Sequence, residues 1–267
     1  MSYFSNLGRR VPFEGMRVFN QSASHYYKLS QPELDFEKIL LRLKQQSLAP
    51  SCYSSESFKN DAQLLLNIIK SDNNYQNLLQ GIHVPFVYSN THKLEDLGRT
   101  IETHLLPSVQ KSFNEMYPNF HFKAILQSNS ELTGKIKVAA GSRYESFIEA
   151  TQKRLTVGWY FPQALQEFDV DSQRRQMASL PQISGAQVCL SGAIDVCAAM
   201  VGSPQLLFSE DFYTPILCMS ALEHHDPRLV LLLKAYGPHL EFWCMTQMLT
   251  KNITQVSEQW SGGLTIY

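Results

Sequence analysis

The chain has 267 residues, of which 44% are hydrophobic and 18% charged, so it is long enough and apolar enough to bury a sizeable core. Lys and Arg together number 23 against 24 Asp and Glu, which leaves a net charge of -1. This balance excludes a global positive field that would draw the chain to nucleic acid or to an anionic membrane surface. We therefore expect no nucleic-acid partner.

Cysteine spacing and hydropathy bear on the compartment. The five cysteines form no CxxC pair and no spacing typical of metal ligands, which favours a reducing compartment. No stretch approaches the roughly 18 apolar residues of a membrane-spanning helix, and the N-terminus lacks the apolar core of a secretory signal. The sequence thus predicts a cytoplasmic protein without a transmembrane segment. A signal recognised by a specialised bacterial secretion system does not need such an apolar core, so the sequence does not exclude export by that route.

The first 81 residues divide into an irregular arm and a helical part. Residues 1–30 show neither helical nor strand periodicity. Over 31–81, Ser30 is placed to cap a helix that ends before Pro50. A second helix begins near Ser57, and a short third one follows it.

Residues 82–161 alternate in the order strand, helix, strand, strand, helix, strand. This is the order of the split βαβ, or ferredoxin-like, sandwich. Pro85 places the first strand at an edge or a bulge, the two middle strands are expected to pair as a hairpin, and Pro162 ends the last strand. The expected segments are strands at 82–88, 120–126, 135–140 and 155–161, and helices at 94–116 and from Ser142 onward.

The remaining residues predict a buried helix and a C-terminal hairpin. Residues 184–202 are apolar on every helical face, which is typical of a core helix. The fold class is thus α+β, with a mixed sheet in residues 82–267, and no linker-like run separates this part from the N-terminal helices, so we expect one compact domain. The other expected segments are helices at 171–180, 212–222 and 248–260, strands at 229–235 and 239–245 paired across Gly237 and Pro238, and an edge strand at 264–267.

Asp195 is the only acidic or basic residue in the apolar stretch 184–202. A carboxylate among apolar side chains must be paired, hydrogen-bonded or protonated. It is a candidate general base, with Ser191 one helical turn earlier as a second polar group of the same cleft. The alternative is a structural acid, either paired with a buried arginine such as Arg143 or Arg228, or capping a helix.

The segment Gly141-Ser142-Arg143 joins a predicted strand to a predicted helix. A helix N-terminus presents free backbone N–H groups and the positive end of the helix dipole, so a phosphate or carboxylate can bind beside Arg143. The further glycines and the lysine of a phosphate loop are missing, which weakens the motif. The alternative is a capping box of Ser142 and Glu145, which explains every residue except Arg143.

The run Glu223-His224-His225-Asp226 contains four potential metal ligands. Adjacent residues on a helix point in different directions, and the spacing of a helical metal motif is absent. We therefore expect no metal site at His224, His225 and Asp226, and no motif indicates a cofactor.

Cys52 precedes several histidines, an order that suits thiol catalysis with His224, His225 or His239 as the base. It lies in the polar segment SCYSSES near an expected helix N-terminus, a position that activates thiols. The alternative is an incidental exposed cysteine. The Gly-x-Ser-x-Gly motif of serine hydrolases is absent around Ser191.

Three hypotheses about function follow. The first is a domain that binds a small anionic ligand, or acts on it as an enzyme, in a pocket lined by Asp195, Ser191 and residues 141–143. The second is a protein-interaction module without catalysis, and the Asn-, Gln- and Ser-rich composition would fit a bacterial effector delivered into a host cell. The third is a hydrolase or transferase that uses Cys52. Whether the chain is an enzyme is left open by the sequence.

Overall fold

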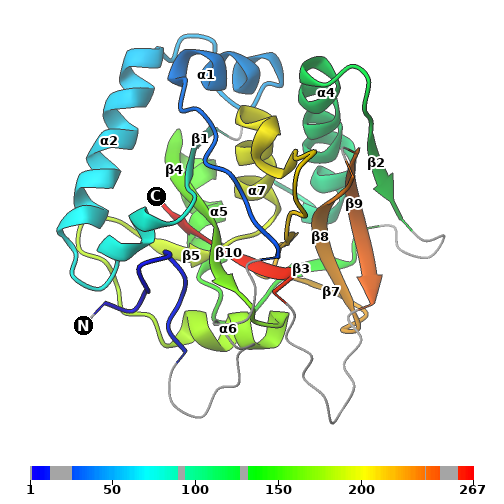
Figure 1. Cartoon of the computed structure of the whole chain (residues 1–267). Helices are drawn as coiled ribbons and strands as arrows, with labels where there is room; N and C mark the ends of the chain where they lie inside the picture. Colours follow the sequence, from blue (N-terminus) through cyan, green and yellow to red (C-terminus); the bar gives the residue numbers. More distant parts are fainter. Residues whose placement is uncertain (1, 13–25, 90–93, 127–131, 238, 247–257) are drawn as a thin grey trace.

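The computed structural model describes residues 2–12, 26–89, 94–126, 132–237, 239–246 and 258–267. It is an α+β protein in which helices pack around a mixed eight-stranded sheet, and a second, small sheet has two strands (Figure 1). The predicted fold class is therefore confirmed at this level. Within these residues, no helix is both long enough and apolar enough to span a membrane.

Three helical elements follow the arm, as predicted: α1 (Phe36–Gln45), α2 (Ser55–Ser71) and the 3₁₀ helix η1 (Gln76–Gln80). Asp35 caps α1 by accepting a hydrogen bond from the Lys38 N–H, a role that the sequence analysis gave to Ser30. Ser54 caps α2 in the same way. α1 and α2 therefore each begin where a side-chain oxygen accepts a hydrogen bond from an otherwise unpaired backbone N–H.

The later helical elements are α3 (Leu97–Thr100), the π-helical turn η2 (Ile101–Leu105), α4 (Leu106–Met116), α5 (Tyr144–Lys153), α6 (Val170–Ala178), α7 (Ala193–Gly202) and η3 (Pro204–Leu207). The helix predicted over 94–116 is irregular because Pro107 has no N–H to donate to the preceding turn. The chain forms a π-helical turn there before α4 begins.

The main sheet has the strand order β1-β4-β10-β6-β8-β9-β2. Its central strand β10 is antiparallel to β4 and β5 and parallel to β6. The strands are β1 (Val84–Tyr88), β2 (Phe122–Ile125), β4 (Thr156–Gln166), β5 (Val188–Leu190), β6 (Ile216–Cys218), β8 (Leu229–Tyr236), β9 (His239–Thr246) and β10 (Trp260–Ile266). The small sheet pairs β3 (Ile136–Val138) with β7 (Leu222–His224).

The ferredoxin-like unit predicted for residues 82–161 is not confirmed. β1 is an edge strand and pairs with β4, but β2 pairs with β9 at the opposite edge of the sheet. β3 belongs to the small sheet, so the expected hairpin of β2 and β3 does not form. The order of elements along a chain restricts strand pairing but does not determine it.

Pro162 lies inside β4 and does not end it, contrary to the prediction. The register shifts at this point, because residues 162–164 of β4 lie opposite the single residue Gly263 of β10. A proline is tolerated at such a bulge, where the ladder needs no N–H donor.

The stretch 184–202 contains a short strand and a short helix in place of the predicted long helix. β5 ends at Leu190, Gly192 precedes α7, and all ten residues of α7 are buried. α7 contacts α1, α4 and β1, so its apolar surface is covered on several sides (Figure 1). The prediction of a core helix is therefore confirmed only for residues 193–202, the second half of this stretch.

Three further predictions concern the C-terminal third. The hairpin across Gly237 is confirmed by the pairing of β8 with β9. The helix expected at 212–222 is wrong, because β6 and β7 form there. The edge strand expected at 264–267 is wrong as well, because Leu264, Thr265 and Ile266 belong to β10 and pair with a strand on each side. Most of the helix expected at 248–260 lies outside the described residues.

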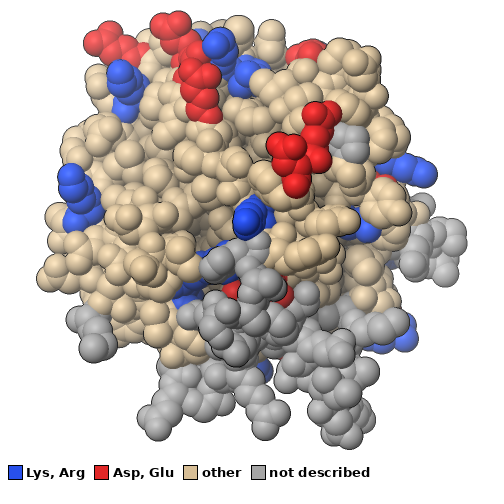
Figure 2. Space-filling view, viewed as in Figure 1, with Lys and Arg blue, Asp and Glu red and all other residues tan. Residues whose placement is uncertain are grey.

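The two faces of the sheet differ in how they are covered. Alternate residues of β8 point to opposite sides, so Leu231 and Leu233 join the main core under α7 and the N-terminal helices. Val230 and Leu232 face the other side and form a smaller cluster with Val170 of α6. Figure 2 shows acidic and basic side chains scattered over the viewed surface, with both signs present.

Candidate functional site

Asp195 lies in the first turn of α7 and has no exposed surface. Its Oδ1 accepts hydrogen bonds from the Gly192 N–H and from the Tyr144 hydroxyl, each at 2.9 Å. Its Oδ2 accepts a hydrogen bond from the Thr265 hydroxyl. Both carboxylate oxygens are therefore satisfied by the protein itself, and we refer to these four residues as the Asp195 centre.

Burial raises the pKa of Asp195 to about 6, and the hydrogen bonds from Thr265, Gly192 and Tyr144 oppose this rise. The Tyr144 hydroxyl also accepts a hydrogen bond from the Ile194 N–H at 2.9 Å, which ties α5 to the start of α7. Glycine is required at 192, because a Cβ there would lie 2.5 Å from the Tyr144 ring. The centre thus joins α5, α7 and β10.

Neither arginine named as a partner of Asp195 contacts it, so that expectation is wrong. Arg143 donates to the Leu180 carbonyl oxygen at 2.5 Å, and Arg228 pairs with Asp226 at 2.7 Å. Ser191 precedes α7 and is connected to Asp195 through Thr265. The Ser191 hydroxyl lies 3.1 Å from the Thr265 hydroxyl, which in turn donates to Asp195. The geometry explains Asp195 as a structural acid, and its catalytic role stays a prediction.

Residues 141–143 form a tight turn before α5. Gly141 has a φ of +74° and Arg143, the cap residue, a φ of +60°, so both are in the left-handed region. The Ser142 hydroxyl accepts a hydrogen bond from the Tyr144 N–H at 3.3 Å, in place of the reciprocal capping box expected with Glu145. Ser142 is buried and Arg143 binds backbone carbonyls, so anion binding by Gly141, Ser142 and Arg143 stays a prediction.

Cys52 is exposed in the turn between α1 and α2, and Ser54 rather than Cys52 caps α2. The candidate bases His224 and His239 belong to β7 and β9, and His225 follows β7. Figure 1 shows these strands on the opposite side of the molecule from the α1–α2 turn. The fold does not bring these three histidines to Cys52, and thiol catalysis stays a prediction.

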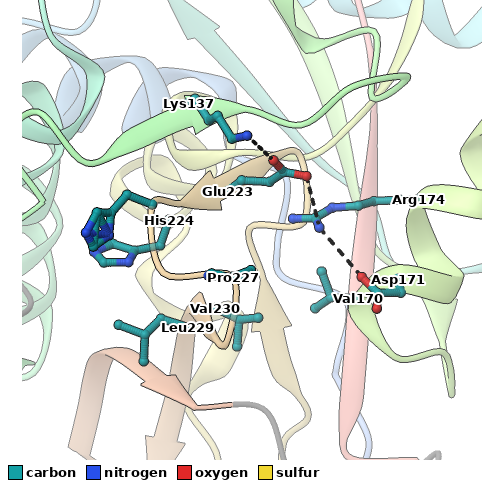
Figure 3. Close-up of a pocket in the computed structure, with 10 residues that line it drawn as sticks. Lys137, Val170, Asp171, Arg174, Glu223, His224, Pro227, Leu229 and Val230 are labelled. Carbon is teal, nitrogen blue, oxygen red and sulfur yellow. Dashed lines mark ion pairs between the residues drawn. The ribbon is translucent and has the colours of Figure 1, made fainter. Parts of the chain in front are cut away.

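A cavity of about 700 Å³ opens between α6, β7 and the start of β8 (Figure 3). We call it the α6–β7 pocket. It lies at the edge of the smaller apolar cluster, because Val170 and Val230 belong to both. A second cavity, of about 270 Å³, lies beside α2 and the start of β4.

One wall of the α6–β7 pocket is a chain of ion pairs. Glu223 lies 3.0 Å from the Lys137 ammonium and 3.3 Å from the Arg174 guanidinium (Figure 3). Lys137 and Glu223 face each other in the β3–β7 ladder, so the register of the small sheet sets this pair. Arg174 also lies 3.7 Å from Asp171 and donates to the Leu222 carbonyl oxygen at 2.8 Å, which fixes its guanidinium against the wall.

The other wall of the pocket is apolar. It consists of Val170 from α6, Pro227 from the β7–β8 turn, and Leu229 and Val230 from β8. Figure 3 shows Pro227, Leu229 and Val230 below Glu223, and Val170 beside Asp171. The pocket therefore offers charge on one side and a hydrophobic surface on the other.

His224 and His225 also line the pocket. His224 is buried, and its Nδ1 accepts a hydrogen bond from the Asp226 N–H at 3.0 Å. Its Nε2 is buried as well and has no hydrogen-bond partner in the structure. The exposed His225 ring lies edge-on to the His224 ring, with the centroids 5.1 Å apart.

The donor set of the pocket limits its chemistry. Among the described residues, no three His, Cys, Asp or Glu side chains come together in a way that could hold a metal ion. No hydroxyl or thiol side chain is found among the described residues that line the pocket. The lining supplies acids, bases and an unpaired N–H donor, which suit binding better than covalent catalysis by Ser, Thr or Cys.

Sequence reasoning missed the ion-paired wall. Lys137 is the middle residue of β3, and Glu223 is the middle residue of β7. The two residues lie directly opposite each other in the ladder. Opposite charges at the centres of two short strands are typical of a cross-strand pair. This charge pattern could have predicted that β3 pairs with β7. The helix predicted for residues 212–222 includes Leu222, the first residue of β7, and so conceals this strand.

Comparisons of the chain with models of protein families, with curated proteins and with solved structures found no match. The function of the chain is therefore inferred from the geometry of the site.

Proposed function

We propose that the protein binds a small molecule in the α6–β7 pocket. The volume of about 700 Å³ lies within the range of roughly 300–1,000 Å³ that is typical of small-ligand sites. The observation that carries the proposal is the division of one cavity into an ion-paired wall and an apolar wall. Such a cavity favours a ligand with a polar head and an apolar body.

This proposal keeps the ligand-binding hypothesis but gives it a new location. Gly141, Ser142, Arg143, Ser191 and Asp195 do not line the α6–β7 pocket. The buried Asp195 has its hydrogen bonds satisfied within the protein, whereas the pocket presents half-exposed charges at its mouth. The ligand is therefore expected beside Glu223 and Arg174.

A fragment screen by ligand-observed NMR tests the proposal. Leu229→Trp fills the pocket, and Asp171→Lys changes its charge without altering a buried side chain. Leu41→Trp is the matched control, because Leu41 is 55% exposed on α1 and lies outside the pocket. We expect fragments that bind the unchanged chain and the control but not Leu229→Trp. The proposal would be refuted if fragments bound the unchanged chain, Leu41→Trp and Leu229→Trp equally, or if no fragment bound the unchanged chain.

A second candidate function is recognition of a protein partner by a surface cluster of Tyr26, Tyr27 and Tyr213. Tyr26 and Tyr213 are 57% and 62% exposed, and their rings stack in parallel with the centroids 5.2 Å apart. Exposed aromatic groups of this kind are common where proteins bind one another. Tyr27 lies against Tyr213 and joins the arm to the segment before β6.

Site-specific photocrosslinking tests this candidate. A benzophenone amino acid in place of Tyr213 is expected to crosslink one defined protein in an extract of the cells that make the chain. The same group in place of Tyr236, which is 71% exposed but far from the tyrosine cluster in sequence and on β8, serves as the control. Equal crosslinking from both positions would count against a specific surface.

A further inference from the structure

His224 holds its ring hydrogen on Nε2. The Asp226 N–H donates to Nδ1 at 3.0 Å, so Nδ1 carries the lone pair. Burial, and after it the neighbouring His225, lowers the pKa of His224, which keeps the ring neutral at pH 7. A neutral imidazole that accepts at Nδ1 has its hydrogen at Nε2. The protein therefore presents an N–H donor at this position.

Among the described residues, this donor has no acceptor. His224 is 3% exposed, its Nε2 finds no hydrogen-bond partner in the structure, and the residue lines the α6–β7 pocket. Buried donors in folded proteins are almost always paired, because an unpaired one loses its hydration without compensation. A ligand that supplies an acceptor oxygen would gain this hydrogen bond.

Each described carboxylate that lines the pocket or acts on His224 is paired with a cation, so an anionic acceptor meets no unpaired carboxylate among them. Asp226 is held by Arg228 at 2.7 Å, and Glu223 by two cations. Lys135 also acts on His224 through its charge. Among the described residues, the charged side chains that line the pocket or act on His224 are the cations Lys135, Lys137 and Arg174 and the carboxylates Asp171, Glu223 and Asp226. The positive and negative charges of this group balance.

We propose that the α6–β7 pocket takes a small carboxylic acid whose carboxylate accepts the hydrogen of His224 Nε2 and whose apolar chain lies against Val170 and Val230. This inference depends on the proposed function, because it names the ligand class of the same pocket. The exposed His225 ring lies beside the His224 ring, with the centroids 5.1 Å apart, and both residues line the pocket that the carboxylate would enter. Lys137 lies on the neighbouring strand, where its ammonium adds attraction for the anion.

A series of probes with one body and different heads tests the ligand class. 4-Phenylbutyrate, 4-phenylbutyramide and 4-phenylbutylamine are titrated against the full chain by protein-observed NMR at pH 7.5. We expect the carboxylate to bind at least about tenfold more tightly than the amine, with the amide between them, because hydrogen bonds to charged groups are the stronger ones. Acetyl-alanyl-leucine is a further probe, and stronger binding by this peptide would identify a peptide C-terminus as the source of the carboxylate.

Substitutions of His224 test the contact itself. His224→Phe is expected to weaken 4-phenylbutyrate binding by about tenfold, because the carboxylate loses the N–H donor of His224. Binding of 4-phenylbutylamine should be unaffected, because its ammonium accepts no hydrogen bond. His224→Gln keeps an N–H donor and is expected to retain part of the preference. His121→Phe is the control, because His121 is exposed next to β2 and stacks on His239 outside the pocket.

The outcomes separate this inference from the proposed function. If no probe and no fragment binds, the pocket proposal itself fails. If the probes bind with equal affinity whatever their head group, the pocket stands and the carboxylic-acid inference is overturned. If His224→Phe does not fold, the three head groups on the unchanged chain still decide the question.

Discussion

The Asp195 centre and the α6–β7 pocket are both built around a carboxylate, yet they have different surroundings. Asp195 is fully buried, and three donors from α5, β10 and its own helix start satisfy its two oxygens. Glu223 has a side chain 29% exposed, contacts two cations, and lies beside an unpaired buried donor. The first arrangement is complete within the protein, whereas the second leaves a hydrogen bond to be made.

This difference shows why burial of an acid is a poor indicator of a binding site. A charge inside a core must be compensated by the protein, and the compensation uses the same hydrogen bonds that a ligand would need. A half-exposed ion pair next to an apolar wall leaves room for a second molecule. Unsatisfied donors at a cavity are therefore more informative about binding than acids in an apolar sequence.

Removal of each carboxylate gives the largest contrast between the two regions. Asp195→Ala leaves the Tyr144 hydroxyl and the Gly192 N–H without an acceptor, so we expect the free energy of unfolding to fall by about 3 kcal/mol or more. Glu223→Ala removes only partly exposed ion pairs and should cost less than about 1 kcal/mol. Urea unfolding of both variants measures the difference. Similar losses would mean that the pocket is as structural as the centre.

The next largest effect is expected in the pH dependence of the free energy of unfolding. The pKa of Asp195 is about 6 in the folded protein and 3.8 without burial, so the folded state holds the proton more tightly. The free energy of unfolding should therefore fall by about 3 kcal/mol as pH rises from about 4 to above 6. Asp195→Asn has no such proton, and urea unfolding across this range is compared between the two proteins. A constant difference between them would show that Asp195 keeps an ordinary pKa.

Loss of one hydrogen bond in the Asp195 centre gives a smaller effect. Tyr144→Phe removes the bonds to Asp195 and to the Ile194 N–H while the ring still packs against Gly192. We expect a loss of about 1–3 kcal/mol in the free energy of unfolding. Tyr236→Phe is the matched control, because Tyr236 is 71% exposed, and thermal unfolding should show no change for it.

The ion-paired wall of the pocket gives the smallest effect. A double-mutant cycle of Lys137→Ala and Glu223→Ala should report a coupling of about 0.2–1 kcal/mol. Because the Lys137 side chain is 70% exposed, the coupling should shrink in 1 M salt. The Asp195 variants should not respond to salt in this way. A coupling that is large and insensitive to salt would place Lys137 in a structural network.

Much of the secondary structure follows from the sequence, but the pairing of strands does not. The hairpin of β8 and β9 is predicted because the turn at Gly237 joins two apolar runs of matching length. β2 and β3 are predicted as strands, yet their partners β9 and β7 lie about a hundred residues away along the chain. Local periodicity carries no information about such distant partners.

The candidate site was harder to predict than the fold. The burial of Asp195 follows from its apolar neighbours, but its partners are Tyr144 and Thr265, whose sequence surroundings show nothing unusual. The apolar stretch 184–202 was assigned to one helix because a strand and a helix buried on all sides give the same continuous apolar pattern. The sequence suggests His224 as a metal ligand or as a base for Cys52, whereas the proposed role of His224 depends on the Asp226 N–H and on a cavity that no sequence pattern reveals.

The position of β10 has a consequence for how the protein is made. β4 and β6 are both joined to β10, which follows β6 by some forty residues and β4 by almost a hundred. During synthesis the ribosome therefore releases two strands whose inner edges stay open until residues 260–266 emerge. Open edges of this kind invite pairing with other chains, and the wait for a distant strand slows folding. A nascent chain of this protein is expected to need a chaperone until its central strand is in place.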